Sequence, residues 1–281
     1  MLLGVPYDGG TTYQPGARLA PYEIRRLSAL VQSWHPGLEV DVFAGLRAVD
    51  GGNVAFPPFD REAVRDLVHR EVAAIHGAGA VPLVIGGDHS VALPAMRAAS
   101  AAHGPLAVVH IDAHLDTSGP EVWGDAHHHG TPLRHAIKEG LVVRDQLYQL
   151  GIRGPWGTCE DDGLSRGHGA TIVGTDEISV RGAASVAAEV KRRVGDRAVY
   201  LTFDIDAIDP AFAPGTGTPV PGGLTSREAF QLVRGLAGCR LVGADLVEVS
   251  PPLDAHDRTS SLAAYLLFEM LAVLASGPDR A

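Results

Sequence analysis

Short apolar runs alternate with longer amphipathic stretches along almost the whole chain, and this alternation constrains the fold more than any other feature. Residues 106–109 read Leu-Ala-Val-Val and offer no polar side chain to either face of a strand, which is typical of a strand covered on both sides. In residues 61–68, by contrast, Val64, Leu67 and Val68 lie on one stripe of a helix. Strands that alternate with helices predict an α/β fold with a mostly parallel sheet.

The pattern divides the chain into eight predicted strands and seven predicted helices. The strands are Leu2–Val5, Leu38–Phe43, Val81–Ile85, Leu106–Asp112, Leu147–Ile152, Thr171–Val173, Ala198–Asp204 and Leu241–Val249. The helices are residues 21–33, 60–77, 90–102, 131–139, 181–194, 225–237 and 259–275. We therefore expect one domain over residues 1–281, a three-layer sandwich with an eight-stranded sheet and helices on both faces. Loops 51–58, 118–130 and 210–223 are predicted to be site loops.

Charge and composition exclude several classes of protein. The 23 Lys and Arg residues against 33 Asp and Glu residues give a net charge of −10, and no basic run is present, so we expect no nucleic-acid partner. No apolar stretch reaches the roughly 18–20 residues that span a bilayer, and the N-terminal segment does not resemble a signal peptide. Two cysteines cannot build a disulfide framework. These features predict a cytoplasmic protein with no membrane partner.

The strongest chemical motif is Asp112-Ala113-His114-Leu115-Asp116, directly after the apolar strand at residues 106–111. In extended backbone, residues i, i+2 and i+4 point to the same side, so Asp112, His114 and Asp116 share one side at a strand end. Open α/β sheets bind their ligands at this edge. Eight of the 13 histidines lie between positions 89 and 135, which also points to a site in this region.

Two further segments repeat this geometry. Asp204 and Asp206 end the apolar strand that begins at Ala198, and His89 follows paired glycines after the strand that ends at Ile85. Carboxylates brought together at strand ends would repel one another unless cations neutralise them. The nearby Asp209-Pro210 is predicted to be a turn rather than a ligand.

The predicted ligand set contains four carboxylates, two imidazoles and no thiolate: His89, Asp112, His114, Asp116, Asp204 and Asp206. Oxygen-rich ligation with some imidazole favours Mn²⁺ over structural Zn²⁺, with nickel as an alternative. Two such ions about 3.5–4 Å apart hold a bridging water and lower its pKa toward neutrality. The sequence therefore predicts two Mn²⁺ ions per chain and hydrolysis by a metal-bridging hydroxide.

The chain resembles the ureohydrolases, the arginase and agmatinase family of binuclear manganese enzymes. The resemblance runs nearly end to end and is carried by residues 4–10, 15–18, 24–25, 86–90, 112–116, 204–210, 248–249 and 251–252. It places the family's metal ligands on the six positions above and implies a homo-oligomer, a trimer or hexamer. Thr202 stands where the family usually has serine before the metal-binding Asp pair, which keeps the hydroxyl.

The resemblance also implies catalytic roles. His129, in His-Gly-Thr-Pro, matches the family's active-site histidine for proton transfer, whereas His127 and His128 are expected to be solvated. Glu248 matches the carboxylate that holds the guanidinium through two parallel hydrogen bonds; the alternative is a structural ion pair with an arginine. Asp206 is expected to hold the proton that leaves the nucleophile.

The predicted substrate is a guanidino compound, hydrolysed to urea and an amine. The amino-acid clamp of arginases looks absent, so the chain resembles agmatinases, and agmatine, which yields putrescine, is the leading substrate. Substrate contacts are predicted for Glu248, Trp156, Thr218, Glu121 and Asp125, the last two because acids favour an amine tail. Guanidinobutyrate or another guanidine, and a metal-dependent C–N amidase acting on formimino or acetyl amines, are the alternatives.

Overall fold

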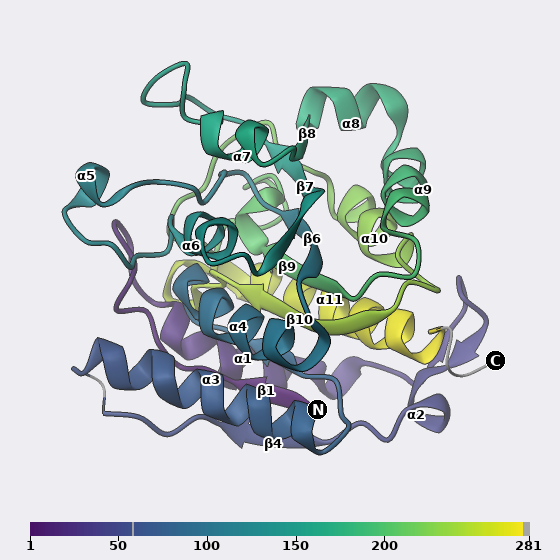
Figure 1. Cartoon of the computed structure of the whole chain (residues 1–281). Coiled ribbons are helices and arrows are strands. Elements are labelled where there is room, and N and C mark those ends of the chain that lie inside the picture. Colours follow the sequence, from purple (N-terminus) through teal and green to yellow (C-terminus); the bar gives the residue numbers. More distant parts are fainter. Residues whose placement is uncertain (58, 278–281) are drawn as a thin grey trace.

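The computed structural model describes residues 1–57 and 59–277 and is built around an eight-stranded sheet (Figure 1). Every neighbouring pair in it is parallel, in the order β4-β1-β5-β10-β9-β6-β7-β8. The strands are β1 (Leu2–Gly4), β4 (Asp50–Asn53), β5 (Leu83–Ile85), β6 (Leu106–Ile111), β7 (Val142–Ile152), β8 (Thr171–Gly174), β9 (Val199–Asp204) and β10 (Leu241–Val247). The predicted α/β class with an eight-stranded parallel sheet is confirmed.

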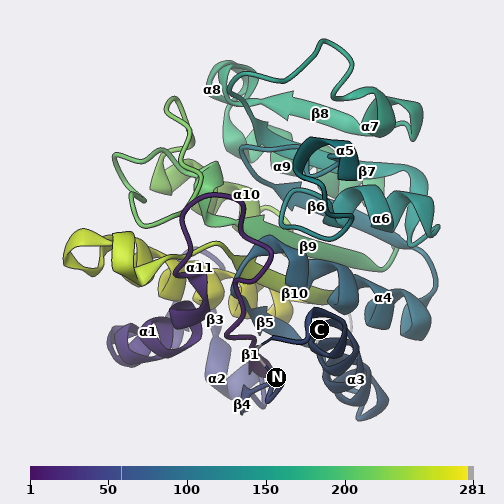
Figure 2. The same cartoon turned by 90° about the vertical axis from the view of Figure 1, so that its left-hand side faces the viewer.

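Helices cover both faces of the sheet (Figure 2). Helices α3, α4 and α6 lie on one face of the sheet, and helices α1, α9, α10 and α11 lie on the other. The helices are α1 (Ala20–Leu27), α2 (Val42–Gly45), α3 (Arg61–Gly77), α4 (Ala92–His103), α5 (Pro120–Trp123), α6 (Pro132–Lys138), α7 (Gly163–Gly167), α8 (Thr175–Arg181), α9 (Ala183–Val194), α10 (Ser226–Arg234) and α11 (Arg258–Ala275). The three-layer arrangement is as predicted.

Two hydrophobic cores result from the alternation of side chains along the strands. In β5, Leu83 and Ile85 belong to the core under α9, α10 and α11, while Val84 between them belongs to the core under α3 and α4. The same alternation divides β6, where Val108 faces α4 and Val109 faces the opposite layer. Because both of their faces are buried, β5 and β6 carry apolar residues at nearly every position.

The strand order brings distant segments to one edge of the sheet. The four central strands are β5, β10, β9 and β6, and the chain passes from β5 to β6 across the positions of the other two. The connection that leaves β6 runs toward β7, and the one that leaves its neighbour β9 runs toward β10, in the opposite direction. Ligands of open α/β sheets bind at the carboxyl ends of the strands at such a point. The segments after these four strands are therefore placed to build a common site.

One predicted strand was wrong. Residues 38–43 do not join the main sheet: β3 (Val40–Asp41) pairs antiparallel with β2 (Trp34–His35), and α2 begins at Val42. The eighth strand is β4, in the segment expected to be a site loop. All four residues of β4 are exposed at the sheet edge, so no apolar pattern marks it.

The longest helix is apolar enough to be compared with a membrane span. Residues 255–275 pass that test by length and composition, but 67% of the apolar window is buried inside the fold. Glu269 in α11 forms an ion pair with Arg234 and lies within hydrogen-bond distance of His35 Nε2, at 3.0 Å. We therefore describe α11 as a core helix that packs against α1, α10 and β10.

Candidate active site and metal centre

All six predicted metal ligands meet at the carboxyl edge of the central strands. His89 follows β5, the Asp112–Asp116 segment follows β6, and Asp204 and Asp206 lie at the end of β9. The Nδ1 atom of His89 lies 2.8 Å from Asp116 Oδ2, 3.1 Å from Asp112 Oδ2 and 3.3 Å from Asp204 Oδ2. The Nδ1 atom of His114 lies 3.1 Å from Asp206 Oδ2 and 3.5 Å from Asp112 Oδ1.

Asp112 stands between two groups of potential ligands. In each group, atoms able to bind a cation lie within 4.8 Å of one another. One group contains His89, His110, Asp112 and Asp116, and the other contains Asp112, His114 and Asp206. The two oxygens of Asp112 face different groups, Oδ2 toward His89 and Oδ1 toward His114. A carboxylate shared in this way fits a centre that holds two cations.

Two buried atoms in this centre lack hydrogen-bond partners among the described residues. They are Nδ1 of His89 and Oδ2 of Asp116, which face each other. Buried polar atoms are rarely left unsatisfied, and a bound cation would take up the lone pairs of both. The residues present therefore fit a metal centre.

The electrostatics of the centre also favour bound cations. Burial raises the pKa of Asp204 well above its usual value, and the charges of Asp206 and Asp112 raise it further. Burial acts to lower the pKa of His114, but Asp206 and Asp112 outweigh it and raise this pKa to about 12. The carboxylates thus repel one another and attract positive charge, and divalent cations would stabilise all of them in the ionised form.

Local backbone structure explains how the ligand loop is held. Asp112 Oδ1 accepts a hydrogen bond from the backbone N–H of His114 at 2.6 Å, and Asp204 Oδ1 accepts one from Asp206 at 2.8 Å. Asp116 has a φ of 55°, in the left-handed region that aspartate tolerates better than most residues. Its carbonyl accepts the N–H groups of Leu133 and Arg134, which ties the loop to α6.

Sequence reasoning missed His110 as an individual functional residue. Its fully buried ring donates from Nε2 to Asp112 Oδ2 at 2.7 Å. A signal was present, because His110 precedes Asp112 by two positions in an apolar strand and so lies on the same face.

His129 forms a buried pair with Glu248. The Nδ1 atom of His129 lies 2.9 Å from Glu248 Oε1, and its Nε2 atom lies 2.7 Å from the hydroxyl oxygen of Thr12. Thr12 was not predicted from the sequence as a site residue. Burial acts to lower the pKa of His129, but the charge and hydrogen bond of Glu248 raise it to about 9. Glu248 Oε1 also accepts the backbone N–H of His89 at 2.8 Å. Among the described residues, Glu248 has this histidine pair and no arginine pair.

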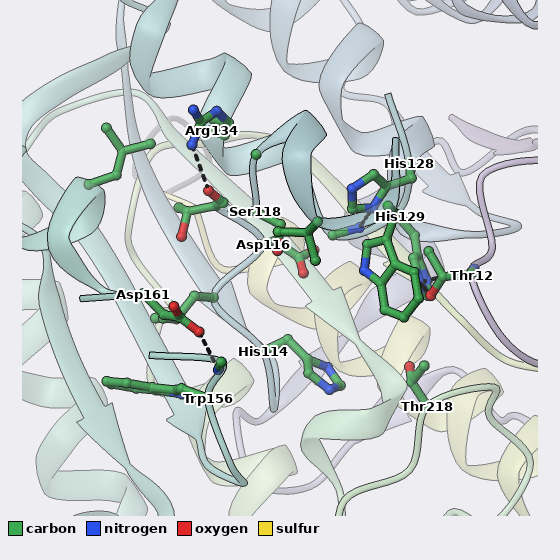
Figure 3. Close-up of a pocket in the computed structure, with 18 of the residues that line it drawn as sticks. Thr12, His114, Asp116, Ser118, His128, His129, Arg134, Trp156, Asp161 and Thr218 are labelled. Carbon is green, nitrogen blue, oxygen red and sulfur yellow. Dashed lines mark hydrogen bonds between the residues drawn. The ribbon is translucent and has the colours of Figure 1, made fainter. Parts of the chain in front are cut away.

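A cavity of about 610 Å³ opens above the centre. Figure 3 shows His114, Asp116 and His129 around this hollow, with Trp156 and Thr218 on opposite sides of His114. The Thr218 hydroxyl donates to Asp206 Oδ2 at 3.1 Å, and Trp156 is 40% exposed. Both residues, with Glu121, line the cavity as expected of substrate contacts.

Asp125 is not placed as predicted. It lies outside the residues that line the cavity and forms an ion pair with Arg61, 2.6 Å from Oδ2 to Nη1. His128 also departs from expectation, because it is buried and its Nδ1 accepts the N–H of Gly130 at 3.1 Å. His127 stacks on His135 with ring centroids 4.3 Å apart. These side chains shape the loop that carries His129.

Two arginines that the sequence did not single out also line the cavity. The guanidinium of Arg153 donates its hydrogen bonds to backbone carbonyls, among them those of Asp206, Ala207 and Val220. Among the described residues, the guanidinium of Arg134 donates only to the carbonyl of Thr117, at 3.3 Å (Figure 3), and no carboxylate lies within ion-pair distance of it. The cavity therefore contains one guanidinium that is available to an anion.

Comparison with known proteins identifies the family. Residues 1–272 match the model of the arginase family. Proclavaminate amidinohydrolase of Streptomyces clavuligerus is 44% identical over 275 residues, 96% of this chain and 86% of that protein. Its solved structure superposes with a TM-score of 0.91 at 43% identity, covering 98% of this chain and 91% of that one.

Two further relatives are named for different activities. Guanidinobutyrase of Pseudomonas aeruginosa is 44% identical over 273 residues, 97% of this chain and 85% of that protein. Mitochondrial agmatinase of Gallus gallus is 40% identical over 278 residues, 97% of this chain and 80% of that protein. The chain belongs to the arginase family and is a hydrolase that acts on carbon–nitrogen bonds of guanidino or amidino groups.

Proposed function

We propose that this protein hydrolyses a guanidino compound to urea and an amine at a centre of two Mn²⁺ ions. The observation that carries the proposal is the pair of ligand groups that share Asp112 beneath the cavity. Divalent cations held by these residues would lower the pKa of bound water and supply a nucleophile near neutral pH. Ni²⁺ is the alternative metal, because the same oxygen and imidazole donors bind it.

The surrounding residues have separate roles. Glu248 is 1% exposed and does not itself line the cavity, but its partners His89 and His129 do. Both hydrogen bonds that it accepts from the described residues end on Oε1, so Oε2 would be left to pair with a guanidinium that reaches it. Asp206, whose Oδ2 accepts the hydroxyl of Thr218, would accept the proton of the attacking water. The charge and hydrogen bond of Glu248 raise the pKa of His129 to about 9, which favours the protonated ring, and a protonated His129 would protonate the departing amine.

Arg134 is the feature of the cavity that favours a carboxylate on the substrate tail, and Glu121, Glu160 and Asp161 line the same cavity. Of the two acids predicted to meet an amine tail, Asp125 is paired with Arg61, while Glu121 lines the cavity. Arg134 offers its guanidinium to the same cavity without a carboxylate partner. We therefore propose a guanidino acid such as 4-guanidinobutyrate as the substrate, in keeping with the relative named guanidinobutyrase. Agmatine is the second candidate, supported by Glu121 and by the relative named agmatinase.

Urea release tests this proposal. Protein loaded with Mn²⁺ is assayed with 4-guanidinobutyrate, 3-guanidinopropionate, agmatine, arginine and guanidine, and bound metal is counted by mass spectrometry. A preference for the guanidino acids supports the whole proposal, and a preference for agmatine keeps the reaction but refutes the tail assignment. Protein with two metals per chain that releases no urea would refute the reaction, and formimino and acetyl amines would then be tested for amidase activity.

We also propose a homo-oligomer, a trimer or hexamer, located in the cytoplasm. The support for this assembly is the family resemblance of the sequence. Light scattering coupled to size-exclusion chromatography measures the mass directly, and a monomer of 29.4 kDa would contradict the assembly.

A further inference from the structure

A row of buried polar side chains crosses the sheet just below the metal centre. Its four members are Asp245 on β10, Thr202 on β9, His110 on β6 and Gln149 on β7. They are neighbours in register, since Thr202 pairs with both Asp245 and His110, and His110 pairs with Gln149. All four are fully buried. Beyond Asp245, the next register position is Val84 on β5, where the row becomes apolar.

With Asp245 ionised, the hydrogen bonds at one end of the row run toward its carboxylate. Asp245 accepts a hydrogen bond from the hydroxyl of Thr202 on Oδ1 at 2.6 Å and one from the hydroxyl of Tyr200 on Oδ2 at 2.8 Å. A threonine hydroxyl has a single proton, so Thr202 can only accept from its other neighbour. That neighbour is His89 Nε2, at 2.8 Å. His89 therefore carries a proton on Nε2, which leaves Nδ1, the atom that faces the carboxylates, as the nitrogen that would bind a cation.

The other end of the row is determined by a backbone carbonyl. The amide nitrogen of Gln149 lies 2.8 Å from the carbonyl oxygen of Leu115, which can only accept. The second N–H of the same amide group points to His110 Nδ1 at 3.2 Å. His110 therefore carries its proton on Nε2 and donates it to Asp112 Oδ2.

We propose that this polar row sets the proton positions of the metal centre. Through Thr202, Asp245 directs the metal-binding nitrogen of His89 toward the carboxylates, and through His110, Gln149 orients Asp112. These are positioning residues, since none of them touches the reacting atoms. Partners behind a ligand histidine select its tautomer and orientation, and losing such a partner typically costs about 10–100-fold in metal affinity. The inference rests on the proposed metal centre.

The sharpest test compares variants of Asp245 and Thr202. In Asp245→Leu, the Thr202 hydroxyl loses its acceptor and turns its proton to His89 Nε2, so the lone pair moves away from the metal side. We expect the affinity for Mn²⁺ or Zn²⁺, measured against a chelating dye, to fall about 10–100-fold. In Thr202→Val the opposing donor is absent, so the fall should be smaller. Thr202→Ser keeps the hydroxyl and should bind like the wild type.

The double variant separates hydrogen-bond direction from lost charge. Adding Thr202→Val to Asp245→Leu leaves the charge unchanged but removes the misdirected hydroxyl, so affinity should partly recover. A ¹⁵N spectrum of the Zn²⁺-loaded wild type should show the proton of His89 on Nε2. No recovery in the double variant, or an unprotonated Nε2, would overturn the proposal.

Two controls keep the outcomes distinct. Val84→Ala removes packing from the same row without a polar contact, and it should lower the melting temperature but leave metal affinity unchanged. If the wild type itself binds no metal, the proposed centre is refuted. If the wild type binds two metals and both single variants match it, the centre stands and the role of the row is refuted.

Discussion

Arg134 provides the most direct test of the substrate tail. It lies in the first turn of α6, where its backbone N–H donates to the carbonyl of the ligand Asp116 at 3.1 Å. The side chain is thereby held beside the metal-binding loop and lines the cavity. We expect Arg134→Gln to weaken the reaction with 4-guanidinobutyrate, because the substrate carboxylate loses its charged donor.

The expected size of the effect follows from the environment of the guanidinium. A hydrogen bond to a charged partner contributes about 1.5–3 kcal/mol, and partial exposure places Arg134 in the lower part of that range. A loss of about 1.5–2 kcal/mol corresponds to a fall of roughly 10–30-fold in kcat/KM. Agmatine, which has no carboxylate, should lose little or gain.

Urea release from both substrates gives the ratio of the two kcat/KM values. Arg134→Lys retains the charge and should keep most of the preference, which separates charge from packing. Equal losses on 4-guanidinobutyrate and agmatine would show that Arg134 supports the loop rather than the substrate. That result would refute the tail assignment while leaving the hydrolytic reaction intact.

Three further predictions concern protonation, metal and the surface. The pKa of His129 is raised from 6.5 to about 9 in the folded protein, so its pairing with Glu248 should stabilise the metal-free protein fully below pH 6.5. This contribution should be lost as the pH rises through about 9. The melting temperatures of the wild type and of His129→Asn should therefore converge as the pH is raised across that range. Chelating the metal should lower the melting temperature, since ions at about 100 times their Kd contribute about 2.7 kcal/mol; an unchanged melt contradicts the centre. Asp125→Ala should change the free energy of unfolding in urea by less than about 1 kcal/mol, because Asp125 forms an exposed ion pair with Arg61. It should also leave kcat/KM unaltered. A large loss of activity would instead place Asp125 at the substrate.

The sequence predicted the layered fold because burial on both faces of a strand leaves a local apolar signal. β6 and β9 were identified in this way, and their helices by stripes of the kind seen in α3. β4 carries no such signal, since its residues are exposed and it is held by backbone pairing with β1. Whether an exposed segment pairs with an edge depends on where that edge lies, which local periodicity does not record.

The metal ligands could be predicted for a related reason. Asp112, His114 and Asp116 directly follow one strand within five residues, so they lie close together at its end. The expected alternation is not what places them, because the chain bends at residues 112–114 and Asp116 has a φ of 55°. The partners of these ligands come from other strands. Asp245 reaches His89 through Thr202 only because β10 lies between β5 and β9.

The sequence alone determined the repeating elements, the ligand types and their positions at strand ends, since each depends on residues close together in the chain. Tertiary structure alone decided that Asp112 lies between two ligand groups, that Asp125 turns to Arg61 and that Arg134 faces the cavity. The physical reason is that strand order and loop direction are set by contacts between residues far apart in sequence, and many such arrangements are compatible with the same local pattern.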